Sequence, residues 1–229
     1  MGKLMTALSQ TPAHHQHNPD LLNLIPSSAE KLIEIGCSYG ALAREFKKIN
    51  PGCHYVGVDI EDFYTNVAKQ HCDECIALDL EVAPESFWGN YSDRDCWIFG
   101  DTLEHFRDPW RILSKIAANM PRKGSIVACI PNAQHWSVQA RLSVGDFRYA
   151  DSGLLDKTHL RWFTRQTMLE LFASAGFKII EGRPRIFPEP RRDDFLPVIE
   201  EMARIAGVDP QIAVSDAMPL QYVMRAVLA

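Results

Sequence analysis

Short apolar runs alternate with helix-forming stretches along the first half of this sequence, and this alternation constrains its fold more than any other feature. The runs are continuous rather than interrupted at every second position, which is typical of strands buried on both faces. Turn signals at 50–52 and 121–124 separate them. We therefore expect an α/β protein with a mostly parallel sheet and helices on both faces. The predicted strands cover residues 31–35, 54–59, 74–78, 95–100 and 125–130.

Later segments extend this architecture and add two excursions from it. Two more strands are predicted at 177–181 and 220–228, which brings the sheet to seven. Residues 132–163 and 184–218 fall outside the alternation, and long polar and aromatic segments of this kind are usually functional. We expect one domain over 1–229, with an N-terminal extension at 1–18 and the two excursions covering the ligand site. The predicted helices cover residues 20–24, 41–49, about 62–71, 110–120, 164–175 and about 193–206.

The charge and hydropathy of the chain argue against several kinds of partner. The net charge is −5 and there is no basic tract, so we expect no nucleic-acid partner. No apolar run approaches the roughly 18 residues of a membrane-spanning helix. The first residues lack the apolar core of a signal peptide, and we expect a cytoplasmic protein.

The cysteines and the N-terminal histidines do not form a recognisable metal site. Six cysteines are scattered in or beside predicted strands, and we expect them to be buried free thiols. Cys72 and Cys75 have metal-like spacing, yet no second pair and no histidine at a zinc-like distance accompanies them. His14, His15 and His17 lack carboxylate or cysteine neighbours and are typical of a solvated or substrate-facing segment. A metal-dependent mechanism would also need a carboxylate triad after the fourth predicted strand, which the sequence lacks, so we expect no metal.

A glycine-rich turn joins the first predicted strand to the helix at 41–49. Its residues Gly36, Ser38 and Gly40 allow a ligand to lie against bare backbone, next to the unpaired N–H groups of a helix N-terminus. Asp59 ends the second strand, 19 residues after Gly40. An acid in that register can accept both hydroxyls of a ribose, so the two features together predict a nucleotide-type ligand.

Acidic residues also lie at or near the ends of the first, third and fourth predicted strands, as Glu34, Asp79 and Asp101. The carboxyl ends of parallel strands meet at one edge of a sheet, and ligands bind outside that edge. We therefore expect these three acids to lie near Gly36 and Asp59 and to form the site with them.

Together these motifs resemble class I S-adenosylmethionine-dependent methyltransferases over about residues 21–182. The motifs are E-x-G-x-x-x-G at 34–40, an acid ending the second strand, Asp-Leu at 79–80 and D-x-L-E-H at 101–105. The family usually has a glycine in place of Ser38, which is also small. An NAD-type domain would show G-x-G-x-x-G, which this turn lacks. The segments before the turn and at 153–164 further resemble bacterial members associated with glycosyltransferases.

The resemblance implies a Rossmann-like fold whose final strand is antiparallel, with S-adenosylmethionine as cofactor. It implies that the methionine portion lies against the glycine turn, which the carboxyl of Glu34 orients, and that the sulfonium lies beside the end of the fourth strand. The implied contacts at this end are Glu34, Gly36, Ser38, Gly40, Gly100 and Asp101.

The adenosine end of the cofactor is implied to lie against the second and third strands. By the same resemblance, Asp59 holds the ribose hydroxyls and Ile60 packs on the adenine. Asp79 accepts from the adenine amino group, and Leu80 lies on the other face of the ring.

Three histidines are candidates for a catalytic base. Methyl transfer from a sulfonium is an in-line displacement in which alignment does much of the work, and a hydroxyl acceptor gains from a base that functions near neutral pH. His105 follows the fourth strand and ranks first, whereas His135 and His159 come from the first excursion and rank second and third. Each of them is also open to a structural or substrate-orienting role.

The first excursion carries the candidate substrate contacts. Arginine recognises phosphate or carboxylate groups in a two-point manner, and aromatic rings stack on sugars or pack in a core. Ion pairs within the segment are an equally open reading of the arginines, and we expect core packing for Trp162. The candidate residues are Trp136, Arg141, Arg148, Tyr149 and Arg161.

Two functions of different classes fit this sequence. The first is methyl transfer to a small polar acceptor, chiefly a hydroxyl of a sugar or secondary metabolite, with an amine or protein acceptor as a variant. The second is a cofactor-binding partner subunit that no longer methylates. The excursion at 184–218 suits either a cap over the acceptor pocket or a contact within a homodimer.

Overall fold

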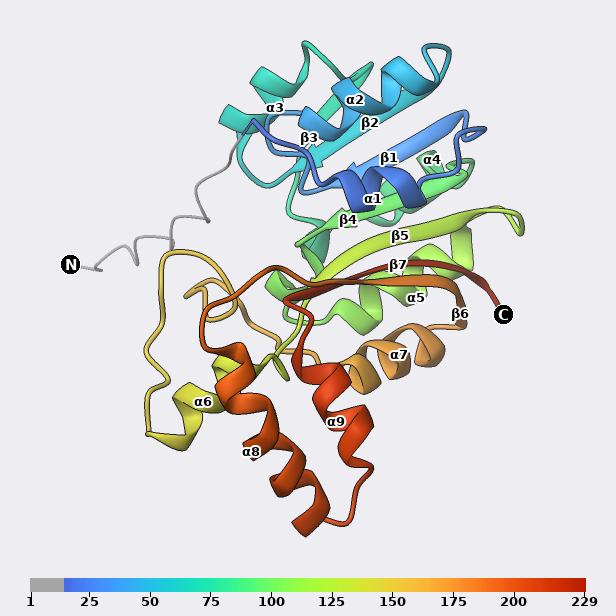
Figure 1. The fold of residues 1–229 in the computed structure, drawn as a ribbon. Coiled ribbons are helices and arrows are strands. Elements are labelled where there is room, and N and C mark those ends of the chain that lie inside the picture. The colour runs from blue at the N-terminus through green and yellow to red at the C-terminus, as the bar shows by residue number, and fades with distance from the viewer. Residues whose placement is uncertain (1–14) are drawn as a thin grey trace, which may run out of the picture.

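The structure, a computed structural model, describes residues 15–229, so most of the predicted N-terminal extension, including His14, lies outside the described residues. One sheet with the strand order β3-β2-β1-β4-β5-β7-β6 forms its centre (Figure 1). β1 to β5 are parallel and β7 is antiparallel to both of its neighbours, which confirms the predicted sheet with an antiparallel last strand. The strands are β1 (Lys31–Ile35), β2 (His54–Asp59), β3 (Glu74–Ala77), β4 (Cys96–Gly100), β5 (Ser125–Pro131), β6 (Phe177–Arg185) and β7 (Gln221–Leu228).

Several of the helices begin where the sequence supplies a capping side chain. Asn18, Asp108 and Asp209 accept hydrogen bonds from the first N–H groups of their helices, and each is followed by a proline suited to the first turn. Thr164 forms a capping box at the start of another helix. The helices are α1 (Pro19–Leu24), α2 (Ala41–Ile49), α3 (Asp62–Ala68), α4 (Glu85–Asn90), α5 (Pro109–Asn119), α6 (Trp136–Ser143), α7 (Arg165–Ser174), α8 (Arg192–Ile205) and α9 (Pro210–Ala217), with short 3₁₀ turns η1 (Leu80–Val82) and η2 (Leu103–His105).

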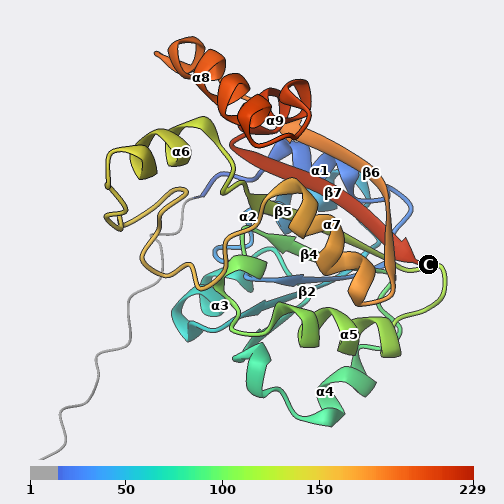
Figure 2. The ribbon, with the colours of Figure 1, turned by 90° about the horizontal axis from the view of Figure 1, so that it is seen from below.

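Two hydrophobic layers sandwich the sheet. Adjacent residues of β4 point to opposite faces, so Trp97 belongs to the layer under α4, α5 and α7, and Ile98 to the layer under α1, α2 and α3. Phe172 on α7 and Phe46 on α2 are fully buried in these two layers. Figures 1 and 2 show α6, α8 and α9 as a separate helical group beyond the β7–β6 side of the sheet.

The excursions contain more regular structure than the sequence predicted. Neither α6 nor α9 was expected, and β6 continues to Arg185 instead of ending at 181. The outer half of β6 is largely exposed and contains Pro184, which an edge strand tolerates because its N–H groups need no partner. The length of β6 is therefore set by its pairing with β7. The polar sequence of its outer half does not indicate this pairing.

Within the described residues the six cysteines are free thiols; five are buried and Cys75 is half-buried, as expected. None of the helices between residues 15 and 229 has the length and apolarity needed to cross a bilayer.

The ends of the first excursion are held together at its base. Asn132 and Phe163 form an isolated bridge, so the chain leaves and re-enters the sheet at one point. The fully buried side chain of Asn132 donates to the carbonyls of Asp216 and Pro219, both at 2.8 Å, and accepts from the N–H of Gln134 at 3.0 Å. This one amide fastens both excursions to the end of β5.

Replacing Asn132 by alanine should destabilise the protein by about 2–3 kcal/mol, because three hydrogen bonds are lost and their buried partners stay unpaired. Urea unfolding followed by circular dichroism measures this change. Asn119→Ala is the matched control, since Asn119 donates only to the carbonyl of Lys115 near a helix end. Equal unfolding midpoints for the two variants would contradict the fastening role of Asn132.

Candidate functional site

A cavity of about 580 Å³ opens at the carboxyl ends of β1, β2 and β4 and is closed from the other side by the segment that leads into α1. This is the edge at which the sequence places the ligand site. The predicted contact Gly40 does not line the cavity and is the N-cap of α2. The predicted cofactor contacts that line the cavity are Glu34, Gly36, Ser38, Asp59, Ile60, Asp79, Leu80, Gly100 and Asp101.

The glycine turn has a backbone that few other residues could adopt. Gly36 and Gly40 have φ values of +78° and +72°, and Ser38 between them has +49°. The N–H groups of Gly36 and Cys37 both donate to the carbonyl of Val58, which ties the turn to the end of β2. A Cβ at Gly36 would lie 2.6 Å from Oγ1 of Thr102, so the turn also needs glycine for close packing.

Asp59 holds the turn from the neighbouring strand. One carboxylate oxygen accepts from the N–H of Ser38 at 2.9 Å, and the other accepts from the N–H of Glu61 at 3.1 Å. The hydroxyl of Ser38 is buried and has no hydrogen-bond partner within the described residues. A buried, unpaired hydroxyl in a cavity wall is the kind of group that a polar ligand satisfies.

Glu34 is a carboxyl group buried in the middle of the sheet. It is 5% exposed, and the hydroxyl of Tyr55 donates to it at 3.0 Å. Burial, with a smaller contribution from the nearby charge of Asp59, raises the pKa of Glu34 to about 8, although the bond from Tyr55 opposes the shift. The group therefore holds a proton at neutral pH unless a cation enters the cavity beside it.

The β3 side of the cavity presents an apolar slot with an acid at its rim. Leu80 is buried, and the side chain of Ile60 is half exposed at the end of β2. Asp79 accepts from the N–H of Glu81 and so begins η1. Ile60, Leu80 and Asp79 all line this part of the cavity.

The end of β4 carries a strained acid. Asp101 has φ of +52°, in the left-handed backbone region that residues other than glycine, asparagine and aspartate rarely adopt. Its carboxylate accepts from the side-chain amide of Gln221 and from the thiol of Cys129. The strained turn after Gly100 is therefore anchored to β5 and β7.

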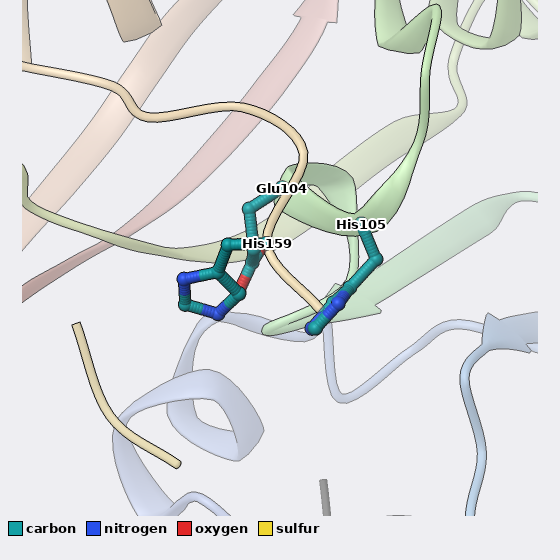
Figure 3. A group of neighbouring side chains, drawn as sticks. All are labelled: Glu104, His105 and His159. Atoms are coloured by element: carbon teal, nitrogen blue, oxygen red, sulfur yellow. The ribbon is translucent and has the colours of Figure 1, made fainter. Parts of the chain in front are cut away.

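Two of the three candidate histidines lie together beside this turn. His105 lines the cavity, and its ring meets that of His159 edge to face with centroids 4.9 Å apart (Figure 3). Burial lowers the pKa of both histidines, so both are neutral at pH 7. Glu104 precedes His105 on η2, with one carboxyl oxygen 3.9 Å from Nε2 of His159, and burial raises its pKa well above the usual range.

The third candidate, His135, lies elsewhere. It is fully buried as the N-cap of α6, and its Nε2 lies 3.0 Å from a carboxylate oxygen of Glu189. The indole of Trp136 donates to the same oxygen at 2.8 Å and stacks on Phe195. The structure therefore places both residues in the contact between the two excursions, outside the wall of the 580 Å³ cavity.

The predicted arginine contacts are engaged within the first excursion. Arg141 and Arg148 both pair with Asp146, and their side chains hold its pKa below the usual range. Arg161 donates to the carbonyl of Arg107 and lies over the ring of Trp110. These three arginines do not line the cavity.

Tyr149 and Trp162 form an aromatic group with Phe147 on the same segment, also outside the cavity wall. The expectation of core packing for Trp162 is wrong, because 37% of its surface is exposed. Its neighbour Phe163 takes the core position instead, since the bridge to Asn132 turns that side chain inward.

Several residues of the cavity wall carried no recognisable signal in the sequence. They come from α1 and the segment before it, from α3, from the turn after β4 and from the first excursion, and the path of the chain brings them to this edge. These residues are Gln16, His17, Asn18, Leu21, Tyr64, Thr102, Arg107, Thr158 and Leu160.

Comparisons with known proteins point in one direction. The model of a family described as "Methyltransferase domain" matches residues 10–181 of this chain. A search of curated proteins returned no match.

Solved structures share the fold at low sequence identity. A SAM-dependent methyltransferase from Archaeoglobus fulgidus is 18% identical, with 91% of each chain covered and a TM-score of 0.62. One from Mesorhizobium loti is 15% identical, with 91% of this chain and 96% of that chain covered and a TM-score of 0.59. Magnesium protoporphyrin IX methyltransferase from Synechocystis PCC 6803, solved with bound SAH, is 13% identical, covers 92% and 80% of the two chains, and has a TM-score of 0.58.

Proposed function

The chain belongs to the methyltransferase-domain family, and from this premise we propose that it transfers a methyl group to a hydroxyl of a small polar acceptor, such as a sugar or a secondary metabolite. S-adenosylmethionine is the cofactor. The observation that carries this proposal is the single cavity edge at which the glycine turn, Asp59 and Asp79 meet His105.

The described side chains suit each part of that cofactor. The unpaired hydroxyl of Ser38 and the buried carboxyl of Glu34 offer an acceptor and a counter-charge to an amino acid end. Asp59 has carboxylate lone pairs for ribose hydroxyls in addition to its two backbone bonds. Leu80 and Ile60 enclose the place of a flat base. When bound, S-adenosylmethionine supplies a methyl group activated on a sulfonium.

His105 supports a hydroxyl acceptor. Its Nδ1 lies 3.1 Å from the carbonyl of Thr158. A carbonyl only accepts, so Nδ1 carries the proton and Nε2 of the neutral ring keeps a lone pair. His105 lines the cavity wall together with Asp101. Its free lone pair can therefore take the proton that an acceptor hydroxyl must lose.

We propose further that residues 132–163 and 184–218 cover the acceptor side of this one domain. Glu189 joins them through its bonds to His135 and Trp136, so the two excursions form one connected cover. A cover over the acceptor side would exclude water from the reacting groups.

Calorimetry with S-adenosylmethionine tests the cofactor site, and we expect saturable binding with one ligand per chain. Transfer of a labelled methyl group to fractions of a cell extract, followed by mass spectrometry, tests the reaction. Label on a hydroxyl oxygen is the expected result, and label on nitrogen would overturn the acceptor assignment. Binding without transfer to any fraction would favour the partner-subunit alternative, and no binding would contradict both.

A further inference from the structure

Glu104, His105 and His159 form a cluster of metal-ligating groups next to the cofactor cavity. One ligand atom from each lies within 4.8 Å of the others, and Nε2 of His159 is 3.9 Å from Oε1 of Glu104. Atoms bound to one ion at about 2.1 Å lie roughly 3 Å apart when adjacent and about 4.2 Å apart when opposite. Small rotations of these side chains would bring the cluster into that range. Figure 3 shows η2 supplying two of the groups and the segment after Asp156 supplying the third.

No hydrogen bond within the described residues compensates the burial of the Glu104 carboxyl. It is 1% exposed, and neither of its oxygens has a hydrogen-bond partner among residues 15–229. Burying a carboxyl group without partners is strongly unfavourable unless a cation or a donor satisfies it. The nearest groups that could share such a cation are the two imidazoles.

Both imidazoles are held in the orientation that metal ligands require. Nδ1 of His105 faces the carbonyl of Thr158 at 3.1 Å, and Nδ1 of His159 faces the carbonyl of Leu154 at 3.3 Å. Carbonyls only accept, so each Nδ1 donates and each Nε2 keeps its lone pair. Such backbone bonds to the second ring nitrogen are what orient histidines bound to metals. Asp156 adds support, since the N–H and hydroxyl of Thr158 both donate to it.

We propose that Glu104, His105 and His159 bind one divalent transition-metal ion in the wall of the cofactor cavity. Two imidazole nitrogens and one carboxylate oxygen suit Mn²⁺, Fe²⁺, Co²⁺, Ni²⁺ or Zn²⁺ better than the all-oxygen preference of Mg²⁺ or Ca²⁺. The site departs from the expectation of no metal, which rested on the cysteines, the N-terminal histidines and the lack of a carboxylate triad after the fourth strand.

The position of the site gives the ion a role toward the acceptor, and this role, unlike the binding itself, rests on the proposed function. His105 belongs to the cavity wall, so coordination positions left free by the three ligands can face the cavity. A bound cation there would polarise an acceptor hydroxyl and lower its pKa. His105 would then act as a ligand and would not take the proton itself.

Metal binding can be measured without substrate. The full chain is treated with a chelator, dialysed and titrated with Mn²⁺, and the free ion is followed by electron paramagnetic resonance. We expect one ion per chain and, with Co²⁺ as a second probe, visible absorption bands of a nitrogen- and oxygen-ligated ion. Glu104→Gln and His105→Asn should each weaken binding at least about a hundredfold, because each removes one of three ligands.

His71, which does not line the cofactor cavity, provides the matched control. A variant with His71 changed to glutamine should bind the ion as the parent does. Loss of binding in this variant, or unchanged binding in Glu104→Gln and His105→Asn, would overturn the site. Calorimetry with S-adenosylmethionine on the same samples separates the two proposals, since an intact cofactor site that binds no metal contradicts only the metal site.

Discussion

Asp59→Ala should lower the affinity for S-adenosylmethionine by about a hundredfold. The substitution removes the acceptor for the N–H of Ser38 at 2.9 Å and for that of Glu61 at 3.1 Å. Hydrogen bonds to a charged group contribute roughly 1.5–3 kcal/mol each, and 2.7 kcal/mol corresponds to a hundredfold change in affinity. The glycine turn loses one of its links to β2, although the bonds to the carbonyl of Val58 remain, and the ribose loses its proposed acceptor. Calorimetric titration measures the change.

Asp73→Ala separates this effect from general destabilisation. Asp73 accepts from the N–H of Tyr55 at 2.7 Å and pairs with Lys47, so it does for the amino end of β2 what Asp59 does for the carboxyl end. We expect Asp73→Ala to lower the unfolding midpoint and to keep cofactor affinity within about a factor of two. Equal losses of affinity in both variants would show that Asp59 has no specific role in cofactor binding.

The free energy of unfolding should fall by about 4 kcal/mol between pH 4.5 and pH 8 because of Glu34. The folded protein keeps the carboxyl of Glu34 protonated up to its pKa of about 8, whereas the unfolded chain releases that proton near 4.5. Over this interval the folded state binds more protons than the unfolded state, so stability falls as the pH rises. Each unit of difference between the two pKa values corresponds to about 1.4 kcal/mol.

Glu34→Gln should flatten this dependence, since the amide keeps the shape and the bond with Tyr55 but cannot ionise. Urea unfolding at pH 5, 6.5 and 8 measures the slope. Glu74→Gln is the control, because Glu74 also accepts from a tyrosine, Tyr91, but is only half-buried at the side of the sheet. A parent and a Glu34→Gln variant with the same slope would show that Glu34 does not titrate as its burial requires.

The edge of the sheet that carries the cavity was predictable because of a property of parallel strands. Their carboxyl ends must meet, so Gly36, Asp59 and Asp79, each recognisable at a strand end, had to converge. The same rule says nothing about residues that reach the edge from outside the sheet. Leu21 closes the cavity from the segment before β1, and no pattern in its neighbourhood indicates this.

The histidines show the limit of ranking residues by position alone. His135 and His159 come from one excursion, and their adjacent ranks as candidate bases did not indicate that they lie in different parts of the structure. In the structure His135 pairs with Glu189 of the second excursion, while His159 packs against His105 and Glu104. Contacts between segments far apart in sequence depend on the path of long loops, which local propensity does not encode.

The sequence by itself determined the layered α/β fold, the seven strands and the cofactor edge, because hydrophobic pattern, caps and turn residues act locally and strand ends converge by geometry. The tertiary structure alone decided which side chains lie opposite the cofactor edge. It placed Arg141 and Arg148 on Asp146, away from the cavity, and it brought His159 to a buried, unpartnered Glu104. Burial and proximity arise only when the excursions fold onto the sheet, and from them come the raised pKa of Glu34 and the proposed metal site.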